Sequence, residues 1–419
     1  MPPCLKLVQL CLFVIPSIAI SAELVQVSKP QNLPVSIGLE TNRGQSRSDV
    51  LFLHRSVRGN FAITPQSILF APMNVQLSVA GGQINPTVSY IDTTENAVNI
   101  YRGKDPEKWI LGIPVHQLVR LSNVYQGIDL EYLSNDRGEL IMRWRIQSGS
   151  SSDQIELEIP QALSLESNTQ SNGIFARFDT NTLHPGLSIP KPSGFQESGG
   201  VKLPKEVSFR LLGPEKFGVQ AEGRDPNRPF VIDLVFSQEA TTSITQWIDS
   251  SKNIYQLQSL TDAAGSEASG TGERWNGCVA TPAWIPCNDA VITKYSSSGK
   301  LLFRTYLSGT RRDIVNSIQP TQDGNLIITG ITESSNFPVS ADAYQKTLNN
   351  IFPTRPPGIY EINGNHFAVI LNPSGLLQRS TYLPKPSRDA LVNTVVANNS
   401  IYFIYSRALA QLPVSGGAF

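Results

Sequence analysis

The sequence has few of the residues from which metal sites and catalytic centres are built. Its 419 residues include four histidines and four cysteines. The histidines lie far apart, and none stands in a His-Glu-x-x-His or similar metal-binding pattern: His54, His116, His184 and His366. No Gly-x-Ser-x-Gly nucleophile motif occurs, because Gly265–Gly270 is one residue too long and lies in a Gly/Ser/Ala-rich run. We therefore predict no catalytic residue, no metal ligand and no bound cofactor.

Charge is also scarce, and it is balanced. Charged residues make up 16% of the chain, and 34 Lys and Arg face 34 Asp and Glu, which gives a net charge of zero. A nucleic-acid partner usually requires a basic excess, so this composition argues against one. Hydrophobic residues reach 40%, which is enough for a packed core. The length allows two or three domains.

Long hydrophobic runs are missing beyond the first 22 residues. At the N-terminus, Lys6 precedes the apolar run Leu7–Ile20, and Ala19-Ile-Ser-Ala22 supplies small residues for cleavage. This pattern predicts a signal peptide over residues 1–22, cut after Ala22, and a secreted, periplasmic or cell-surface mature protein. The alternative is an uncleaved N-terminal anchor, although the run is short for a membrane span.

Two cysteines, Cys278 and Cys287, remain after such a cleavage. In an exported protein, two cysteines that close a proline-containing loop predict a disulfide. A loop of this size would stabilise the fold by about 2–3 kcal/mol in the chain-entropy picture. The alternative is two free thiols. A zinc site would need two further ligands, which no nearby His or Cys supplies.

Amphipathic helices of three turns are missing as well, whereas short strands recur from residue 23 to 237. Gly138–Ile146 alternates with period two and places Leu140, Met142, Trp144 and Ile146 on one face. Further strands are predicted at Phe61–Thr64, Ser67–Phe70, Val75–Val79, Ile155–Ile159, Gly173–Phe178, Val207–Leu211 and Phe230–Phe236. Short strands joined by turns predict an all-β, sandwich-like N-terminal module over residues 23–237.

The remaining residues repeat themselves. Asp289–Leu307 forms strand, turn and strand, and Phe367–Leu383 does the same with the same Thr-Tyr-Leu ending. The closing segment Phe337–Tyr344 returns as Leu412–Phe419. The spacings are 76 residues (305 to 381) and 75 residues (337 to 412). A fixed period with matching turns is typical of repeat architectures, and we interpret each unit as a β-propeller blade.

We therefore predict a partial β-propeller over residues 238–419. It comprises a weak blade at 238–277, in which Trp247–Tyr255 resembles Gln322–Ile327, a blade at 278–350 and an incomplete blade at 351–419. Propellers usually close with four to eight blades. Either the sequence belongs to a longer protein with further blades downstream, or the ring is completed by assembly.

Short motifs in both parts carry a resemblance to known bacterial proteins. In order, the N-terminal motifs are Glu40-Thr-Asn-Arg-Gly-Gln45, Asn99–Trp109, Ile113–Val115, Val124–Tyr132 and Pro229–Val235. This series resembles an uncharacterised all-β domain that commonly precedes propeller repeats in exported proteins. The C-terminal units are similar to SBBP-type β-propeller repeats, through the Leu371–Gly375 turn and the Phe-Pro…Ala-Tyr-Gln close. The resemblance implies an exported all-β architecture and implies no reaction.

A few side chains are weak candidates for chemistry. Asp129 and Glu131 share one strand face and could bind Ca²⁺ or transfer protons, but a solvated strand face is the expected role. Asp323-Gly324 resembles half a calcium loop and is better explained as a hairpin turn that needs positive φ. Three tryptophans could form a sugar platform, although the last two are better explained as loop packing: Trp247, Trp275 and Trp284.

The predicted function is non-enzymatic: an exported binding or surface-scaffold protein whose propeller loops recognise an unknown protein or glycan. No nucleic-acid partner and no membrane span after signal cleavage are expected. A carbohydrate-active enzyme or lyase on a propeller is the first alternative, because fold alone does not decide function. A cluster of two or three carboxylates at the mouth of the ring would favour the enzyme, and their absence, with an aromatic or neutral polar surface, would favour binding. The second alternative is a structural spacer in a larger surface protein.

Overall fold

The computed structural model describes residues 11–14, 25–26, 37–56, 58–71, 75–168, 173–179, 186–198, 200–237, 244–261, 288–311, 313–321, 323–348, 364–383, 391–397 and 400–405. Over these ranges the chain is built from β-strands, and the helical elements are two 3-10 turns, η1 (Pro106–Lys108) and η2 (Ser152–Gln154). The prediction of an all-β fold is thus confirmed. None of the helices in this part of the chain has the length and apolar character needed to cross a membrane.

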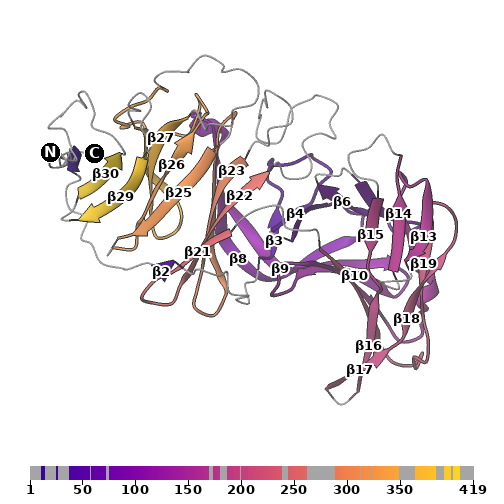
Figure 1. Cartoon of the computed structure of the whole chain (residues 1–419). Helices are drawn as coiled ribbons and strands as arrows, with labels where there is room; N and C mark the ends of the chain where they lie inside the picture. The colour runs from indigo at the N-terminus through magenta and orange to yellow at the C-terminus, as the bar shows by residue number, and fades with distance from the viewer. Residues whose placement is uncertain are drawn as a thin grey trace, which may run out of the picture.

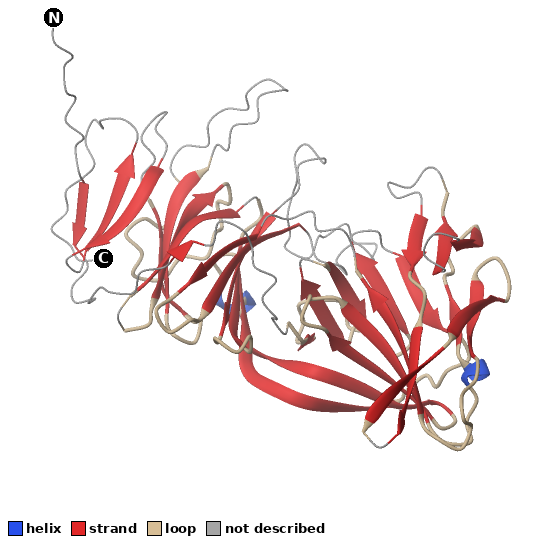
Figure 2. Cartoon of the chain, turned by 60° about the horizontal axis from the view of Figure 1, so that its bottom comes forward, coloured by secondary structure: helices blue, strands red, loops and turns tan. Residues whose placement is uncertain are grey.

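Two sheets diverge from the long strand β9 (Ile110–Tyr125). One edge of β9 pairs with β8 (Thr87–Arg102). The other edge pairs first with β3 (Leu39–Thr41) and then with β10 (Ile128–Ser134). Because β3 and β10 occupy successive stretches of one edge, each of them begins its own sheet. Figure 2 shows long, curved strands that reach from the first half of the molecule (described residues within 37–237) to the second half (described residues within 244–405).

The two sheets enclose the core of one half of the molecule. From β10 the first sheet runs through β11 (Leu140–Ile146), β20 (Phe230–Phe236), β16 (Ser193–Ser198) and β17 (Val201–Lys205). From β3 the second runs through β4 (Phe52–Ser56), β5 (Gly59–Ile63), β6 (Ser67–Ala71), β7 (Val75–Val79), β12 (Glu156–Glu158), β19 (Lys216–Ala221) and β18 (Val207–Leu211). A small sheet of β13 (Ser164–Asn168), β14 (Gly173–Arg177) and β15 (Gly186–Ile189) adds to the same core.

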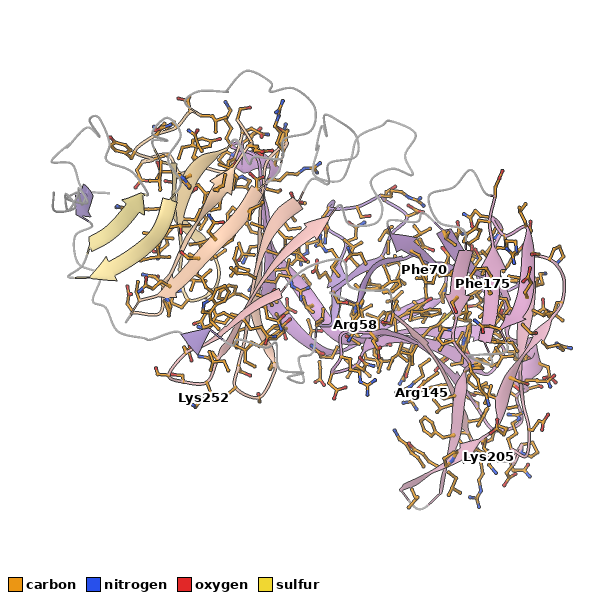
Figure 3. All side chains as sticks on the ribbon, viewed as in Figure 1. Arg58, Phe70, Arg145, Phe175, Lys205 and Lys252 are labelled. Atoms are coloured by element: carbon orange, nitrogen blue, oxygen red, sulfur yellow. The ribbon has the colours of Figure 1, made fainter. Side chains whose placement is uncertain are left out.

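The alternation of β11 explains how one sheet covers this core. Leu140, Met142, Trp144 and Ile146 are at most 1% exposed and belong to the core, as the period-two pattern predicts. Phe70 reaches the same core from β6, on the opposite sheet, and Figure 3 marks its position. Burying large side chains from both sheets supplies most of the driving force for this half, at roughly 1.5–3 kcal/mol for each fully buried side chain.

Strand β24 (Leu301–Ser308) joins the two halves of the molecule. It pairs in parallel with the last residues of β8, and Arg304 lies opposite Val98. From β24 the sheet continues through β23 (Asn288–Tyr295), β22 (Ile254–Thr261), β21 (Ile244–Ile248) and β2 (Val25–Gln26). Residue 237 is the predicted end of the N-terminal module. The pairing of β24 with β8 therefore joins strands from before and after this boundary.

Two further antiparallel sheets follow in sequence (Figure 1). The first contains β25 (Asp313–Pro320), β26 (Leu326–Thr332), β27 (Asn365–Leu371) and β28 (Leu377–Tyr382). The second contains β29 (Leu391–Ala397), β30 (Ser400–Tyr405) and β1 (Cys11–Val14). Apolar residues of β22–β24 share one core with apolar residues of β25–β28, among them Phe303, Ile328 and Phe367. The β21–β24 and β25–β28 sheets are therefore packed against each other.

Candidate functional site

The loop between β3 and β4 is shaped by one side chain, Asn42. Its Oδ1 accepts hydrogen bonds from the backbone N–H groups of Gly44 and Ser46, both at 3.1 Å. Its Nδ2 donates to the carbonyl oxygens of Arg47 and Val50, at 2.7 and 2.8 Å. Asparagine favours such local bonding to backbone two or more residues away. The Asn42 amide therefore holds the loop 42–50 in one conformation.

This loop forms one wall of a cavity of about 470 Å³. Its polar lining comes from the loop and the strand before it: Thr41, Asn42, Gly44, Ser46 and Ser48. Its apolar lining comes from Val50, Leu51, Phe52, Val88 and Tyr90. Among the described residues, the lining contains no carboxylate, lysine or arginine, so this lining is neutral. We call it the Tyr90 pocket.

Two rings, Tyr90 and Phe52, line the Tyr90 pocket, and a third ring, His116, packs against both of them. Tyr90, on β8, stacks on His116 of β9 with ring centroids 4.3 Å apart and planes 17° apart. Phe52, on β4, meets both rings edge to face, at 5.8 Å from Tyr90 and 5.9 Å from His116. Tyr90 is 51% exposed, while Phe52 and His116 are buried. His116 therefore covers one face of the Tyr90 ring, and much of the ring stays open to solvent.

His116 is fixed by two hydroxyl groups. Its Nε2 lies 2.8 Å from Thr41 Oγ1, and its Nδ1 lies 2.8 Å from Thr93 Oγ1. Burial lowers the pKa of His116, and Glu95 only partly opposes this effect. The ring is therefore neutral at pH 7, with one nitrogen donating and the other accepting. Its place beneath Tyr90 makes it a support for that ring.

Directly before the pocket wall, Glu40 lies in a buried ionic network that joins both halves. Glu40, Arg55, Arg304 and Tyr306 are each at most 2% exposed. Glu40 accepts hydrogen bonds from Arg55, from Arg304 Nη1 at 3.1 Å and from the Tyr306 hydroxyl at 3.0 Å. Burial alone would raise the pKa of Glu40, but Arg55 and Arg304 outweigh it and hold the pKa below its ordinary value. The carboxylate is thus ionised.

The network anchors the start of the pocket loop to β24. Arg304 also donates to the carbonyl oxygen of Arg55 at 3.1 Å and to Thr293 Oγ1 at 3.2 Å. The Arg55 guanidinium lies 4.2 Å from the ring centroid of Tyr306. A buried charge that loses its partner is costly, which ties the position of Glu40 to Arg304. Since Thr41 follows Glu40, the second half of the molecule fixes one edge of the pocket.

A second cavity, of about 510 Å³, lies where the halves meet. Residues 92–94, Gln117 and Asp136 line it from the first half, and Ser298, Gly299 and Lys300 line it from the β23–β24 turn. It holds two carboxylates, Asp92 and Asp136, and one cation. We call it the junction cavity. Its charged lining distinguishes it from the neutral Tyr90 pocket.

Asp129 and Glu131, the paired carboxylates of the sequence, lie side by side on β10 but differ in environment. Glu131 is fully buried, and its Oε1 accepts from Arg120 at 2.6 Å and from Arg145 at 2.7 Å. Figure 3 marks Arg145 on the lower side of the first half of the molecule. Asp129 accepts from the backbone N–H of Asn123 at 2.8 Å. The expectation of a solvated strand face is therefore wrong for Glu131, because two arginines from neighbouring strands cover it.

The described histidines are not brought together. His54 lies between the carbonyl oxygens of Gly38 and Gly138, and burial lowers its pKa to about 4. His366 is buried on β27, and His184 lies outside the described residues. The described part of the chain holds no group of three His, Cys, Asp or Glu side chains arranged for a metal.

Two sequence expectations concern turns and tryptophans. Gly324 has a φ of +81°, which confirms the hairpin turn predicted at Asp323-Gly324. Trp247 is half-buried against the core of the second half. Trp275, Trp284, Cys278 and Cys287 lie outside the described residues, as do most residues of the expected signal peptide. The disulfide and the cleavage after Ala22 stay predictions.

The sequence reasoning missed Tyr90, Ser46 and the Glu40 network as functional candidates. The sequence contains a signal for Tyr90, because Val88 and Tyr90 are two residues apart and a strand places both on one face. Both line the pocket. The motif Glu40–Gln45 was recognised only through its resemblance. Its physical meaning is now plain: Glu40 enters the network and Asn42 shapes the loop.

A comparison with known protein families finds a match over part of this chain. Residues 70–233 match a family described as a domain of unknown function, DUF7948. The match includes β8 and β9, and so Tyr90 and His116, while the loop 42–50 lies before it. It supports the expected uncharacterised domain in the first half. No curated protein matches the chain.

Proposed function

We propose that this chain, with a DUF7948 domain at residues 70–233, is a non-enzymatic exported binding protein that takes its ligand in the Tyr90 pocket. One observation carries the proposal: an exposed aromatic ring stands beside a hydroxyl- and amide-lined cavity that holds no ionisable carboxylate or amine. Concave sites with aromatic walls and a few fixed polar groups are typical of ligand binding. Acid–base catalysis, in contrast, most often uses a His, Asp, Glu or Lys within reach of the ligand, and the described lining contains none of these.

The propeller and sandwich assignments belong to the same proposal. Two antiparallel sheets, β21–β24 and β25–β28, follow one another and share a core, as successive blades do. Both open with a hairpin whose turn contains a residue at positive φ, Lys252 at +64° and Gly324 at +81°. In the first half, two sheets facing one core support a sandwich-like module. On this proposal the blades hold the pocket loop in place through β24.

The enzyme alternative rests on the junction cavity. Asp92 and Asp136 line it together, and a carboxylate pair is the minimum for glycoside hydrolysis. Within the described residues, neither side chain is held by a hydrogen bond or an ion pair, in contrast to the fixed groups of the Tyr90 pocket. The junction cavity would become the active site if turnover were found and Asp92→Asn removed it.

The test uses the full chain against a panel of soluble polysaccharides and of peptides. A ligand that binds only the folded state raises the melting temperature in proportion to the logarithm of its concentration. We expect at least one panel member to raise it, with no new product by mass spectrometry. Product formation that Asp92→Asn abolishes would favour the enzyme. A flat response to every member would favour the spacer.

A further inference from the structure

We propose that the Tyr90 pocket binds the apolar face of a neutral hexopyranose, stacked on the open face of Tyr90. This inference rests on the proposed binding function and names its ligand class. A pyranose presents a patch of C–H groups on one side and hydroxyls around its rim. It therefore matches a site that offers one open aromatic face and a rim of neutral hydrogen-bonding groups.

Tyr90 is preorganised for stacking. His116 occupies one ring face at 4.3 Å, and Phe52 contacts the edge at 5.8 Å. His116 is itself fixed by Thr41 and Thr93. The ring therefore loses little freedom when a ligand stacks on it, which removes part of the entropic cost of binding.

One hydroxyl group of the pocket lacks a hydrogen-bond partner among the described residues. Ser46 lines the pocket, and its Oγ is buried without a hydrogen bond to any described residue. Buried polar atoms in folded proteins are nearly always paired, and a rotation of the Ser46 side chain toward the cavity would let its hydroxyl bond a ligand there. The hydroxyls of a sugar both donate and accept, which suits a serine whose hydrogen is free to rotate.

The charged side chains near the pocket point to a neutral ligand. Two charged side chains of the loop, Arg47 and Asp49, bind each other and do not line the pocket. Arg43 is exposed and its Nη1 contacts the carbonyl oxygen of Gly112 at 3.3 Å. With no ionised group in the lining, the pocket offers no partner for a carboxylate or ammonium, whose desolvation would oppose binding. We expect neutral glycans to be preferred over uronic acids.

The experiment measures binding of laminaripentaose, cellopentaose and maltopentaose to the full chain by titration calorimetry, with a polygalacturonate oligomer as the charged comparison. At least one neutral pentaose should bind, and the acidic oligomer should bind more weakly. Tyr90→Ala should weaken binding about tenfold or more, as loss of an aromatic anchor does. Tyr90→Phe keeps the ring and should stay within about threefold of wild type, since the polar tip is not required.

Two further variants separate stacking from general damage. Ser46→Ala removes the unpaired hydroxyl and should weaken the sugar without lowering the melting temperature. Ile91→Ala changes the neighbouring residue, which is 43% exposed and does not line the pocket, and should leave binding unchanged. Near-ultraviolet circular dichroism of each variant confirms that the fold is kept.

The outcomes distinguish this inference from the function on which it rests. Equal affinity of wild type and Tyr90→Ala for a pentaose overturns the stacking site. If none of the three pentaoses binds but a peptide from the panel does, and its binding needs Tyr90, the sugar proposal is overturned and the binding function is kept. Failure of sugars and peptides alike overturns both.

Discussion

The backbone N–H of Leu377 donates a hydrogen bond to the hydroxyl of Tyr101, 276 residues earlier, at 2.7 Å. Tyr101 lies one residue before the end of β8, and Leu377 is the first residue of β28 in the next sheet. Burial raises the pKa of Tyr101, which keeps its hydroxyl protonated. This bond, with the core that surrounds it, locks the β25–β28 sheet onto the strand that carries Tyr90.

Tyr101→Phe should therefore destabilise the protein. The variant leaves the Leu377 N–H without its acceptor, which costs about 1–3 kcal/mol when the donor stays buried. The matched control is Tyr132→Phe. Tyr132 is fully buried, and its hydroxyl makes no hydrogen bond within the described residues. Removing that hydroxyl should be neutral or stabilising. Urea unfolding of both variants measures the difference, and equal losses would contradict it.

Arg304→Met should be the more damaging change, because it breaks the buried network at Glu40. Removing one partner of a buried pair costs about 3–5 kcal/mol, since the remaining charge stays unpaired. Arg304→Lys should rescue little, because a lysine cannot reach Glu40, Thr293 and the Arg55 carbonyl together. The comparison is Arg379→Met, which removes an ion pair with Asp342 that is 41% and 57% exposed. Calorimetry should find a large loss of melting temperature only for the Arg304 variants.

The sequence was sufficient for what depends on local pattern. Val75–Val79 matches strand β7, because alternation along one strand records which face is buried. Val207–Leu211 and Phe230–Phe236 match strands β18 and β20. It was insufficient for the Tyr90 pocket. Thr41 meets His116 across 75 residues, and that register depends on β9 sharing one edge between β3 and β10.

The charged residues illustrate the same limit. Glu131 was expected in solvent because charge on a strand usually marks the open face. Instead Arg120 and Arg145 cover it. Only Arg145 lies in a segment, Gly138–Ile146, whose alternation predicts a strand from the sequence. Similarly, nothing near Glu40 in the sequence points to Arg304, 264 residues away. Non-local partners of buried charges leave no periodic signal.

Asp313→Asn should change how stability depends on pH. Burial raises the pKa of Asp313 to about 7, against hydrogen bonds from the Gly309 N–H at 2.7 Å and Ser334 Oγ at 3.0 Å. Between about pH 4 and 7 the folded state holds a proton that the unfolded chain has released. Stability contributed by this group is therefore present at low pH and lost as pH rises through 7.

Asparagine stays neutral, so Asp313→Asn should gain relative to wild type as pH rises. The difference in unfolding free energy between variant and wild type should change by on the order of 4 kcal/mol from pH 4 to pH 8, from a shift of about three pKa units. Urea unfolding at the two pH values measures it. An identical difference at both would show that the carboxyl is ionised throughout.

Gly375→Ala tests the contact between the two sheets at its closest point. Gly375 has a φ of +77°, and an added Cβ would lie 2.5 Å from Phe303 Cδ2 and 2.9 Å from Thr305 Oγ1. Its carbonyl oxygen also accepts a hydrogen bond from Thr305 Oγ1 at 2.7 Å. Phe303 and Thr305 belong to β24, so the turn before β28 sits directly on the neighbouring sheet.

The matched control is Gly149→Ala, where φ is +82° and no atom lies within 4 Å of the added Cβ. Both variants share the strain of a left-handed residue, about 1–2 kcal/mol. Only Gly375→Ala also pushes the sheets apart, because the aromatic ring of Phe303 is buried and cannot move freely. We therefore expect the loss of unfolding free energy at Gly375 to exceed that at Gly149 by about 1–3 kcal/mol. Equal losses would mean that the β24 contact yields without cost, and that the two sheets are not held in one rigid packing.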